Sequence, residues 1–205
     1  MKKKTDDSFI MLPIVDFCFK ELMQNAKVRQ GFIAALLAVK PEAVMETELM
    51  PTILRQEHAD DKMGILDVRV KLVDGTQMDF EMQVAFFDYW EKRILFYLGK
   101  MYTGQLKKGE SYETLQKCIH VSILDFIHFP EDERCYRTIS FCDMETGELY
   151  SDLMEIKILE LKKLQEDVPD HSSVYDWMKF FGGKSRRNLR TWHRQMSTSE
   201  KPARN

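Results

Sequence analysis

The chain has 205 residues, of which 44% are hydrophobic and 31% are charged, so one globular domain with a sizeable core is expected. Its formal net charge of −3 at pH 7 excludes a general electrostatic attraction to nucleic acid, and any such binding would need local positive charge. The longest apolar stretch, residues 31–39, is too short to span a membrane, and no signal-peptide pattern follows the basic start, which predicts a cytoplasmic protein.

The first predicted elements precede a β-hairpin. Residues 13–39 carry apolar side chains at helical spacing, which predicts one helix or two short helices interrupted near Gly31. Residues 46–57 predict an extended segment, which Pro51 limits to a sheet edge or a break. Two alternating stretches then predict the hairpin: residues 65–72 and residues 77–84.

In both hairpin stretches the even positions are apolar and the odd positions after residue 65 are polar. This alternation indicates strands with one face in a core and the other turned to a cleft or to solvent. A two-residue turn would pair apolar positions with polar ones, which is unfavourable. We therefore predict a three-residue turn, with Gly75 in the left-handed conformation. That register places Asp67 opposite Glu81 and Arg69 opposite Asp79.

The elements after the hairpin are predicted to complete a mixed sheet. Asp88 and Glu91 form a capping-box-like start for a helix that Gly109 would end. The apolar run 117–126 predicts a strand in the middle of the sheet. Further extended segments are predicted at residues 135–141 and 155–161, with a turn at residues 145–147 between them, and the second segment also fits a helix.

The opposed pair suggests a metal site. Directly opposed antiparallel side chains have Cβ atoms roughly 4.5 to 5.5 Å apart, so Asp67 and Glu81 would repel unless they share a cation. Mg²⁺ is held by one or two carboxylates together with retained waters, and it can activate water for phosphodiester hydrolysis. Gln83 lies on the same face and could orient a water or a phosphate oxygen. The alternative is an ordinary pair of solvated acids.

Several motifs occur in an order that is more specific than the hairpin alone. They are Asp16-Phe-Cys-Phe-Lys20, Ile65-Leu-Asp-Val-Arg-Val70, Phe80-Glu-Met-Gln83, Arg93 with Tyr97 and Tyr102, and Gln105-Leu-Lys-Lys-Gly109 with Tyr112. Together they resemble the PD-(D/E)XK nuclease family transposases, also called recombination-promoting nucleases, from about Pro13 to Leu164. The resemblance implies a Mg²⁺-dependent DNA endonuclease with a restriction-endonuclease-like αβββαβ core. We expect a mixed central sheet of about four or five strands, flanked by helices.

The resemblance also implies roles for individual residues. Asp67 matches the central metal-binding acid, Glu81 the second acid, and Gln83 the position where the wider superfamily usually has lysine. Asp16 matches an acidic residue of the first helix and could assist at the metal or its waters. The structural alternative for Asp16 is a helix N-cap.

The usual lysine needs a replacement if the site is active. Lys20 is favoured because it lies one helical turn from Asp16, although it could equally be a plain i,i+4 partner of that residue. Lys62 is too far along an extended strand from the acids unless the chain bends. Arg69 is on the correct face but is opposed to Asp79, with which it could pair.

The chain divides into three predicted parts. Residues 1–12 form a flexible N-terminus, residues 13–166 a PD-(D/E)XK nuclease-like domain, and residues 167–205 a linker, a short amphipathic segment and a basic C-terminal tail. The tail could follow a phosphate backbone, although such termini are more often solvated and disordered. Basic residues that could contact DNA are Arg69, Arg93, Lys184, Arg186 and Arg187.

Two other functions stay open at this point. The chain could be a catalytically inactive remnant that binds DNA or protein, or an RNA-directed nuclease of the same fold. No membrane partner is expected, and a homodimer is one option for the oligomeric state.

Overall fold

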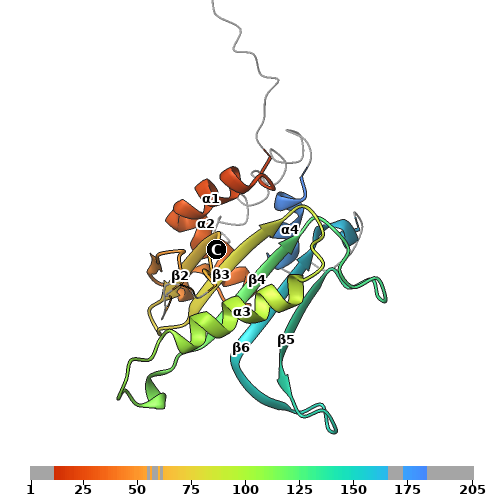
Figure 1. The fold of residues 1–205 in the computed structure, drawn as a ribbon. Coiled ribbons are helices and arrows are strands. Elements are labelled where there is room, and N and C mark those ends of the chain that lie inside the picture. Colours follow the sequence, from red (N-terminus) through yellow and green to blue (C-terminus); the bar gives the residue numbers. More distant parts are fainter. Residues whose placement is uncertain (1–11, 55, 57–59, 61, 166–172, 184–205) are drawn as a thin grey trace, which may run out of the picture.

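The computed structural model describes residues 12–54, 56, 60, 62–165 and 173–183, and these form a mixed sheet with helices on both faces (Figure 1). The described strands are β1 (Thr47–Leu49), β2 (Val68–Leu72), β3 (Gln77–Gln83), β4 (Cys118–Leu124), β5 (Tyr136–Cys142) and β6 (Leu149–Glu160). The described α-helices are α1 (Asp16–Gln24), α2 (Ala26–Leu36), α3 (Trp90–Thr103) and α4 (Ser173–Phe181). Single-turn 3-10 helices occur at Pro41–Ala43, Tyr112–Thr114 and Leu161–Lys163.

The sheet has the strand order β1-β2-β3-β4-β6-β5. The three strands β3, β4 and β6 run parallel to one another, whereas β1, β2 and β5 pair antiparallel with their neighbours. The predicted mixed α/β sheet is therefore confirmed, but it has six strands in the described residues instead of four or five. Residues 46–57 were predicted to be extended, at a sheet edge or a break, and β1 within them does lie at the edge of the sheet.

The predicted hairpin register is confirmed. Arg69 pairs with Asp79 across β2 and β3, and Val68 pairs with Phe80. Gly75 has a φ of 89°, the left-handed conformation that this turn was expected to need. Asp67 lies just before the first residue of β2 and faces the part of β3 that contains Glu81.

The helical region before the hairpin divides at Asn25, and the predicted interruption near Gly31 is wrong. The Asn25 side chain accepts hydrogen bonds from the N–H groups of Lys27 and Val28 at 3.0 and 3.2 Å, so it caps the start of α2. Gly31 lies inside α2, where a Cβ atom would stand 3.2 Å from Cζ2 of Trp177. The glycine therefore allows a close approach of α4 and does not end a helix.

The bounds of α3 differ from the prediction. The helix begins at Trp90, after the N-cap Tyr89, and no side chain of the predicted capping box bonds there. It ends at Thr103, and Gly104 is the C-cap. A Cβ atom at Gly104 would meet the carbonyl oxygen of Lys100 at 2.7 Å, so a glycine suits this position. The predicted stop, Gly109, instead occupies a later turn with a φ of 91°.

The two faces of the sheet have different surroundings. The even-numbered side chains of β2 and β3 pack under α1, α2 and α4 in the largest hydrophobic cluster. The opposite face was expected to meet a cleft or solvent, but α3 crosses it and buries Gln77, Asp79 and Glu81. For these three residues the prediction is wrong, because alternation shows that a face is polar and not that it is exposed, whereas Asp67, Arg69 and Gln83 are partly exposed and Lys71 is exposed.

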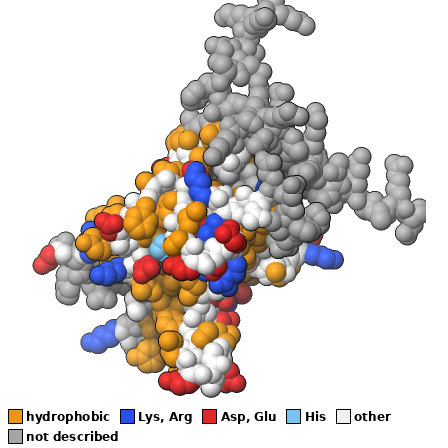
Figure 2. Space-filling model, turned by 90° about the vertical axis from the view of Figure 1, so that its right-hand side faces the viewer, with side chains coloured by type: hydrophobic (Ala, Val, Ile, Leu, Met, Phe, Trp, Pro, Cys, Tyr) orange, Lys and Arg blue, Asp and Glu red, His pale blue; other side chains and the backbone are white. Residues whose placement is uncertain are grey.

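The central strand β4 is buried along its whole length, as the apolar run 117–126 predicted. Residues 155–161, for which a helix was the alternative, lie mostly in β6. The first residues of β6 pair with β5 alone, since β4 joins the ladder only at Met154. The two strands therefore project as a hairpin below the sheet (Figure 1). Figure 2 shows hydrophobic side chains over this projection and acidic side chains at its tip.

The helix α4 is part of the main core. Its Trp177 and Phe181 rings lie 5.4 and 5.0 Å from the ring of Phe32 on α2. The predicted nuclease-like domain ended at residue 166, and that boundary stays a prediction, but the hydrophobic core includes side chains beyond it. Within the described residues, no helix combines the length and apolarity needed to cross a membrane.

Candidate active site

The two acids of the hairpin are held together by the backbone. The N–H of Asp67 donates to Oε1 of Glu81 at 3.2 Å, and the N–H of Met82 donates to Oδ2 of Asp67 at the same distance. Each carboxylate is thus fixed by the strand that carries the other one. Because both donors are backbone N–H groups, in β3 and directly before β2, the acid pair is pre-positioned without movement of long side chains.

Glu81 is a strongly perturbed carboxyl group. It is 0% exposed, and its burial, together with the nearby Asp67 carboxylate, raises its pKa to about 7. His120 and Arg93 act in the opposite direction. Arg93 Nη2 lies 3.0 Å from Glu81 Oε2. The amide of Gln83 also donates to Oε2, at 3.4 Å, so the outer oxygen of Glu81 has two donors.

The first helix brings a lysine to the acid pair. Nζ of Lys20 lies 3.1 Å from Oδ1 of Asp67 and 2.9 Å from Oδ1 of Asp16. Burial alone would lower the pKa of Lys20, but the hydrogen bonds to Asp16 and Asp67 outweigh it and raise that pKa. The expected i,i+4 pair of Asp16 and Lys20 is therefore present, whereas the N-cap of α1 is Val15 and not Asp16.

The donor set suits a hydrated, hard cation. In the part of the chain that the structure describes, no three His, Cys, Asp or Glu side chains are grouped so that they could hold a metal by themselves. Two adjacent carboxylates are a set that Mg²⁺ accepts, because this ion keeps several waters and one or two carboxylates can anchor it. Asp67 and Glu81 therefore fit the expected metal, with Gln83 beside them.

Of the arginines predicted to contact DNA, two have partners inside the protein. Arg69 Nη2 donates to Oε1 of Gln77 at 2.7 Å, and Arg93 pairs with Glu81. Because each guanidinium already donates to a side chain of β3, neither presents all its donors to solvent. The other predicted contacts, Lys184, Arg186 and Arg187, lie outside the described residues.

A buried polar chain on β3 and β4 was missed by sequence reasoning. Asp79 Oδ2 lies 2.7 Å from Nδ1 of His120, and Nε2 of the same ring lies 2.9 Å from Oγ of Ser122. Ser122 is the register partner of Glu81, so the chain leads along the sheet to the acid pair. A signal existed in the sequence, because His120 and Ser122 alternate within an otherwise apolar strand.

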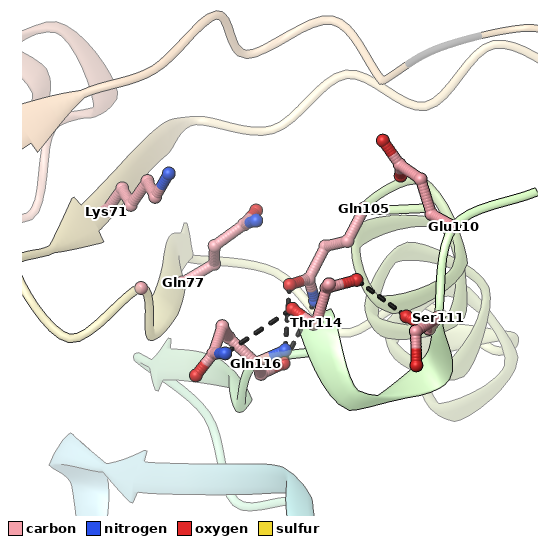
Figure 3. Close-up of a pocket in the computed structure, with 8 residues that line it drawn as sticks. Lys71, Gln77, Gln105, Glu110, Ser111, Thr114 and Gln116 are labelled. Carbon is pink, nitrogen blue, oxygen red and sulfur yellow. Dashed lines mark hydrogen bonds between the residues drawn. The ribbon is translucent and has the colours of Figure 1, made fainter. Parts of the chain in front are cut away.

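A pocket of about 390 Å³ opens at the turn end of the hairpin (Figure 3). Here Gln105 Nε2 donates to the carbonyl oxygen of Gln116 at 2.9 Å, and the N–H of Gln116 donates back to Gln105 Oε1 at 3.0 Å. This reciprocal pair joins the segment after α3 to the start of β4. Gln105, which belongs to one of the sequence motifs, therefore has a structural use away from the acids.

Comparisons with known proteins agree with this geometry. A sequence model of the PD-(D/E)XK nuclease family transposases matches residues 13–201, which include every described helix and strand. Nucleases of this kind generally depend on a divalent metal, typically Mg²⁺. No curated protein and no solved structure is similar enough to the chain to count as a match.

Proposed function

Because this chain belongs to the PD-(D/E)XK nuclease family transposases, we propose that it is a Mg²⁺-dependent DNA endonuclease that acts in transposition or recombination. The observation that carries the proposal is the acid pair, in which Asp67 and Glu81 accept backbone N–H groups from each other's strand. Surface acids without a common task would extend into water, since burial of a carboxylate is costly.

Each residue of the site would have a separate task. Asp67 and Glu81 hold the cation, which when bound polarises a phosphoryl oxygen and lowers the pKa of a coordinated water. The Gln83 amide orients the attacking water or a phosphate oxygen. Lys20 stabilises negative charge that develops on the phosphate, and thus takes the role of the usual lysine. Asp16 positions the Lys20 ammonium group and assists at the waters of the metal.

Arg93 would be a positioning residue in this scheme. Its guanidinium bonds both to Glu81 and to the hydroxyl of Tyr97, at 3.0 and 3.1 Å. The arginine is thereby held on α3 while it fixes the outer oxygen of Glu81. The orientation of the second acid thus depends on the helix that covers this face of the sheet.

The test is cleavage of supercoiled plasmid by the purified protein with Mg²⁺ and with EDTA. We expect nicking in Mg²⁺ by the parent, and at least a 100-fold loss of rate in Glu81→Ala and Asp67→Asn. Glu148→Ala is the matched control, because this exposed acid lies at the tip of the β5–β6 hairpin, and it should cut at the parental rate.

The outcomes separate the alternatives. Continued cutting by Glu81→Ala, with a melting temperature equal to that of the parent, would refute the site. An intact plasmid in every lane, together with intact single-stranded DNA of the same sequence, would favour an inactive binding module. A parallel lane with RNA of the same sequence distinguishes an RNA-directed nuclease, which would degrade that strand and leave the DNA intact.

A further inference from the structure

The loop that follows Gln83 carries exposed aromatic side chains. Between β3 and α3, the exposed fractions are 60% for Phe86, 47% for Phe87 and 62% for Tyr89. A soluble protein gains nothing for its own folding from three such rings in water, whereas large exposed apolar groups at one place typically mark a binding surface. These rings begin three residues after the amide that contacts Glu81.

The rings are exposed but held in place. Phe86 contacts Phe126 edge-on with ring centroids 5.7 Å apart, and Phe87 contacts Tyr89 at 6.1 Å. The N–H of the buried Trp90 donates to the carbonyl oxygen of Phe87 at 3.1 Å, which fastens the loop to the first turn of α3. The loop therefore presents pre-ordered π faces, and little ordering entropy is lost when a flat ligand binds.

The chemistry of the rings and their position favour nucleic acid as that ligand. The ammonium group of Lys92 lies 5.5 Å from the centre of the Tyr89 ring, so a cation accompanies the aromatic surface. The helix α1, whose Lys20 contacts Asp67, carries a further exposed ring at Phe17. Aromatic side chains beside a cation are the means by which proteins bind unpaired bases, since every base offers a face for stacking.

The burial of the two acids also favours one form of nucleic acid over another. Glu81 is 0% exposed, and only 18% of the Asp67 side chain is accessible, with Lys20 and Arg93 beside the two acids. A phosphate must therefore come close to a recessed pair. The backbone of a stacked duplex is held at a fixed distance from its helix axis, whereas a strand with unpaired bases can bend toward the buried acids while its bases stack on the rings.

We propose that residues 84–89 form a stacking platform for unpaired bases, so that the substrate is single-stranded or locally unpaired DNA. This rests on the proposed nuclease function, because it names the form of DNA that the same site takes. The loop supplies stacking without base-edge hydrogen bonds, and the expected sequence preference is therefore weak.

The test measures binding in EDTA, where no cleavage occurs, by fluorescence anisotropy. The probes are a 20-nucleotide single strand, its blunt duplex and a duplex of the same length with a central unpaired bubble. We expect the parent to bind the single strand and the bubble at least fivefold more tightly than the duplex. Phe86→Ala with Phe87→Ala should weaken single-strand binding by about tenfold and duplex binding by less than twofold.

Two further variants show whether the rings act by stacking. Phe86→Tyr with Phe87→Tyr keeps the π faces and should retain the preference, whereas the corresponding double change to Leu keeps only apolar surface and should lose it. If the rings instead bound a protein or a lipid surface, the change to Leu would keep the apolar surface that such a partner needs, and neither double variant would alter the preference for the single strand. Tyr150→Ala, which removes an exposed ring on the β5–β6 hairpin, is the control and should bind like the parent.

Equal affinity of the parent for the single strand and the duplex would overturn the inference, as would an unchanged preference in the double Ala variant. Thermal melting of each variant excludes unfolding as the cause of a loss. Because binding is read without metal, the two proposals fail separately. A protein that prefers unpaired strands but cuts nothing would refute only the nuclease function, and one that cuts all duplexes without preference would refute only the platform.

Discussion

The raised pKa of Glu81 makes a prediction about the pH dependence of stability. The pKa of its carboxyl group is about 7 in the folded protein, compared with 4.5 for a glutamate in the unfolded chain, because burial and Asp67 disfavour the charged form. Between these two values the folded state holds a proton that the unfolded state has already released. The free energy of unfolding therefore falls as the pH rises from 4.5 to about 7 and is level above that.

The magnitude follows from the separation of the two pKa values. At about 1.4 kcal/mol per pH unit, this separation corresponds to about 3 kcal/mol. Glu81→Gln has no charge to bury, so it should gain about 3 kcal/mol relative to the parent between pH 4.5 and about pH 8. The attraction between Arg93 and the Glu81 carboxylate is already included in the pKa of about 7, so it is not counted a second time.

The assay is urea unfolding of both proteins in EDTA at several pH values, followed by circular dichroism. In a second series, Mg²⁺ replaces EDTA. The metal should stabilise the parent more at about pH 8 than at pH 4.5, because it binds the ionised carboxylate, and it should affect the variant little. A stability difference between variant and parent that does not change with pH would refute the reasoning, since it would mean that Glu81 is charged at its ordinary pKa.

Other changes give separate readouts. Lys20→Met should lower the single-turnover cleavage rate by about 100-fold with a smaller effect on KM, and an unchanged rate would exclude Lys20 as the replacement for the usual lysine. Asn25→Ala should lower the free energy of unfolding by about 1 kcal/mol in urea, because α2 loses its cap. Gly31→Val should cost about 1–3 kcal/mol in the same assay, since its side chain meets Trp177. Gly99→Ala, on an open face of α3, should instead stabilise by about 0.5–1 kcal/mol, and a loss there would contradict the packing described.

The hairpin was the part of the site that the sequence could predict. Alternation with a period of two fixes which residues share a face, and only one turn length keeps those faces consistent, so the pairing of Arg69 with Asp79 followed without other information. The predicted central strand also followed, because a short and mostly apolar run is typical of a strand buried on both faces in the middle of a parallel sheet.

The surroundings of the hairpin depend on contacts between distant residues, and local patterns do not encode them. The burial of Asp79 and Glu81 arises because α3 crosses their face, and the arrangement of a helix over a sheet is a tertiary property. The break at Asn25 was missed since Gly31 is the weaker helix former, yet a side-chain cap outweighs a glycine that packing requires. The same limit applies to Lys20, whose contact with Asp67 joins two segments far apart in the chain.

The way in which α4 closes the main core sets a lower bound on any working fragment. A protein stopped at residue 166 would leave the ring of Phe32 uncovered on one side, and it would expose much of the apolar layer beneath α1 and α2. That layer also packs against one face of β2 and β3, and the two acids belong to the set of polar side chains on the opposite face. Shortening the chain for crystallisation or for activity measurements should therefore retain every residue up to Phe181, because α4, the last helix among the described residues, packs against the layer that supports β2 and β3.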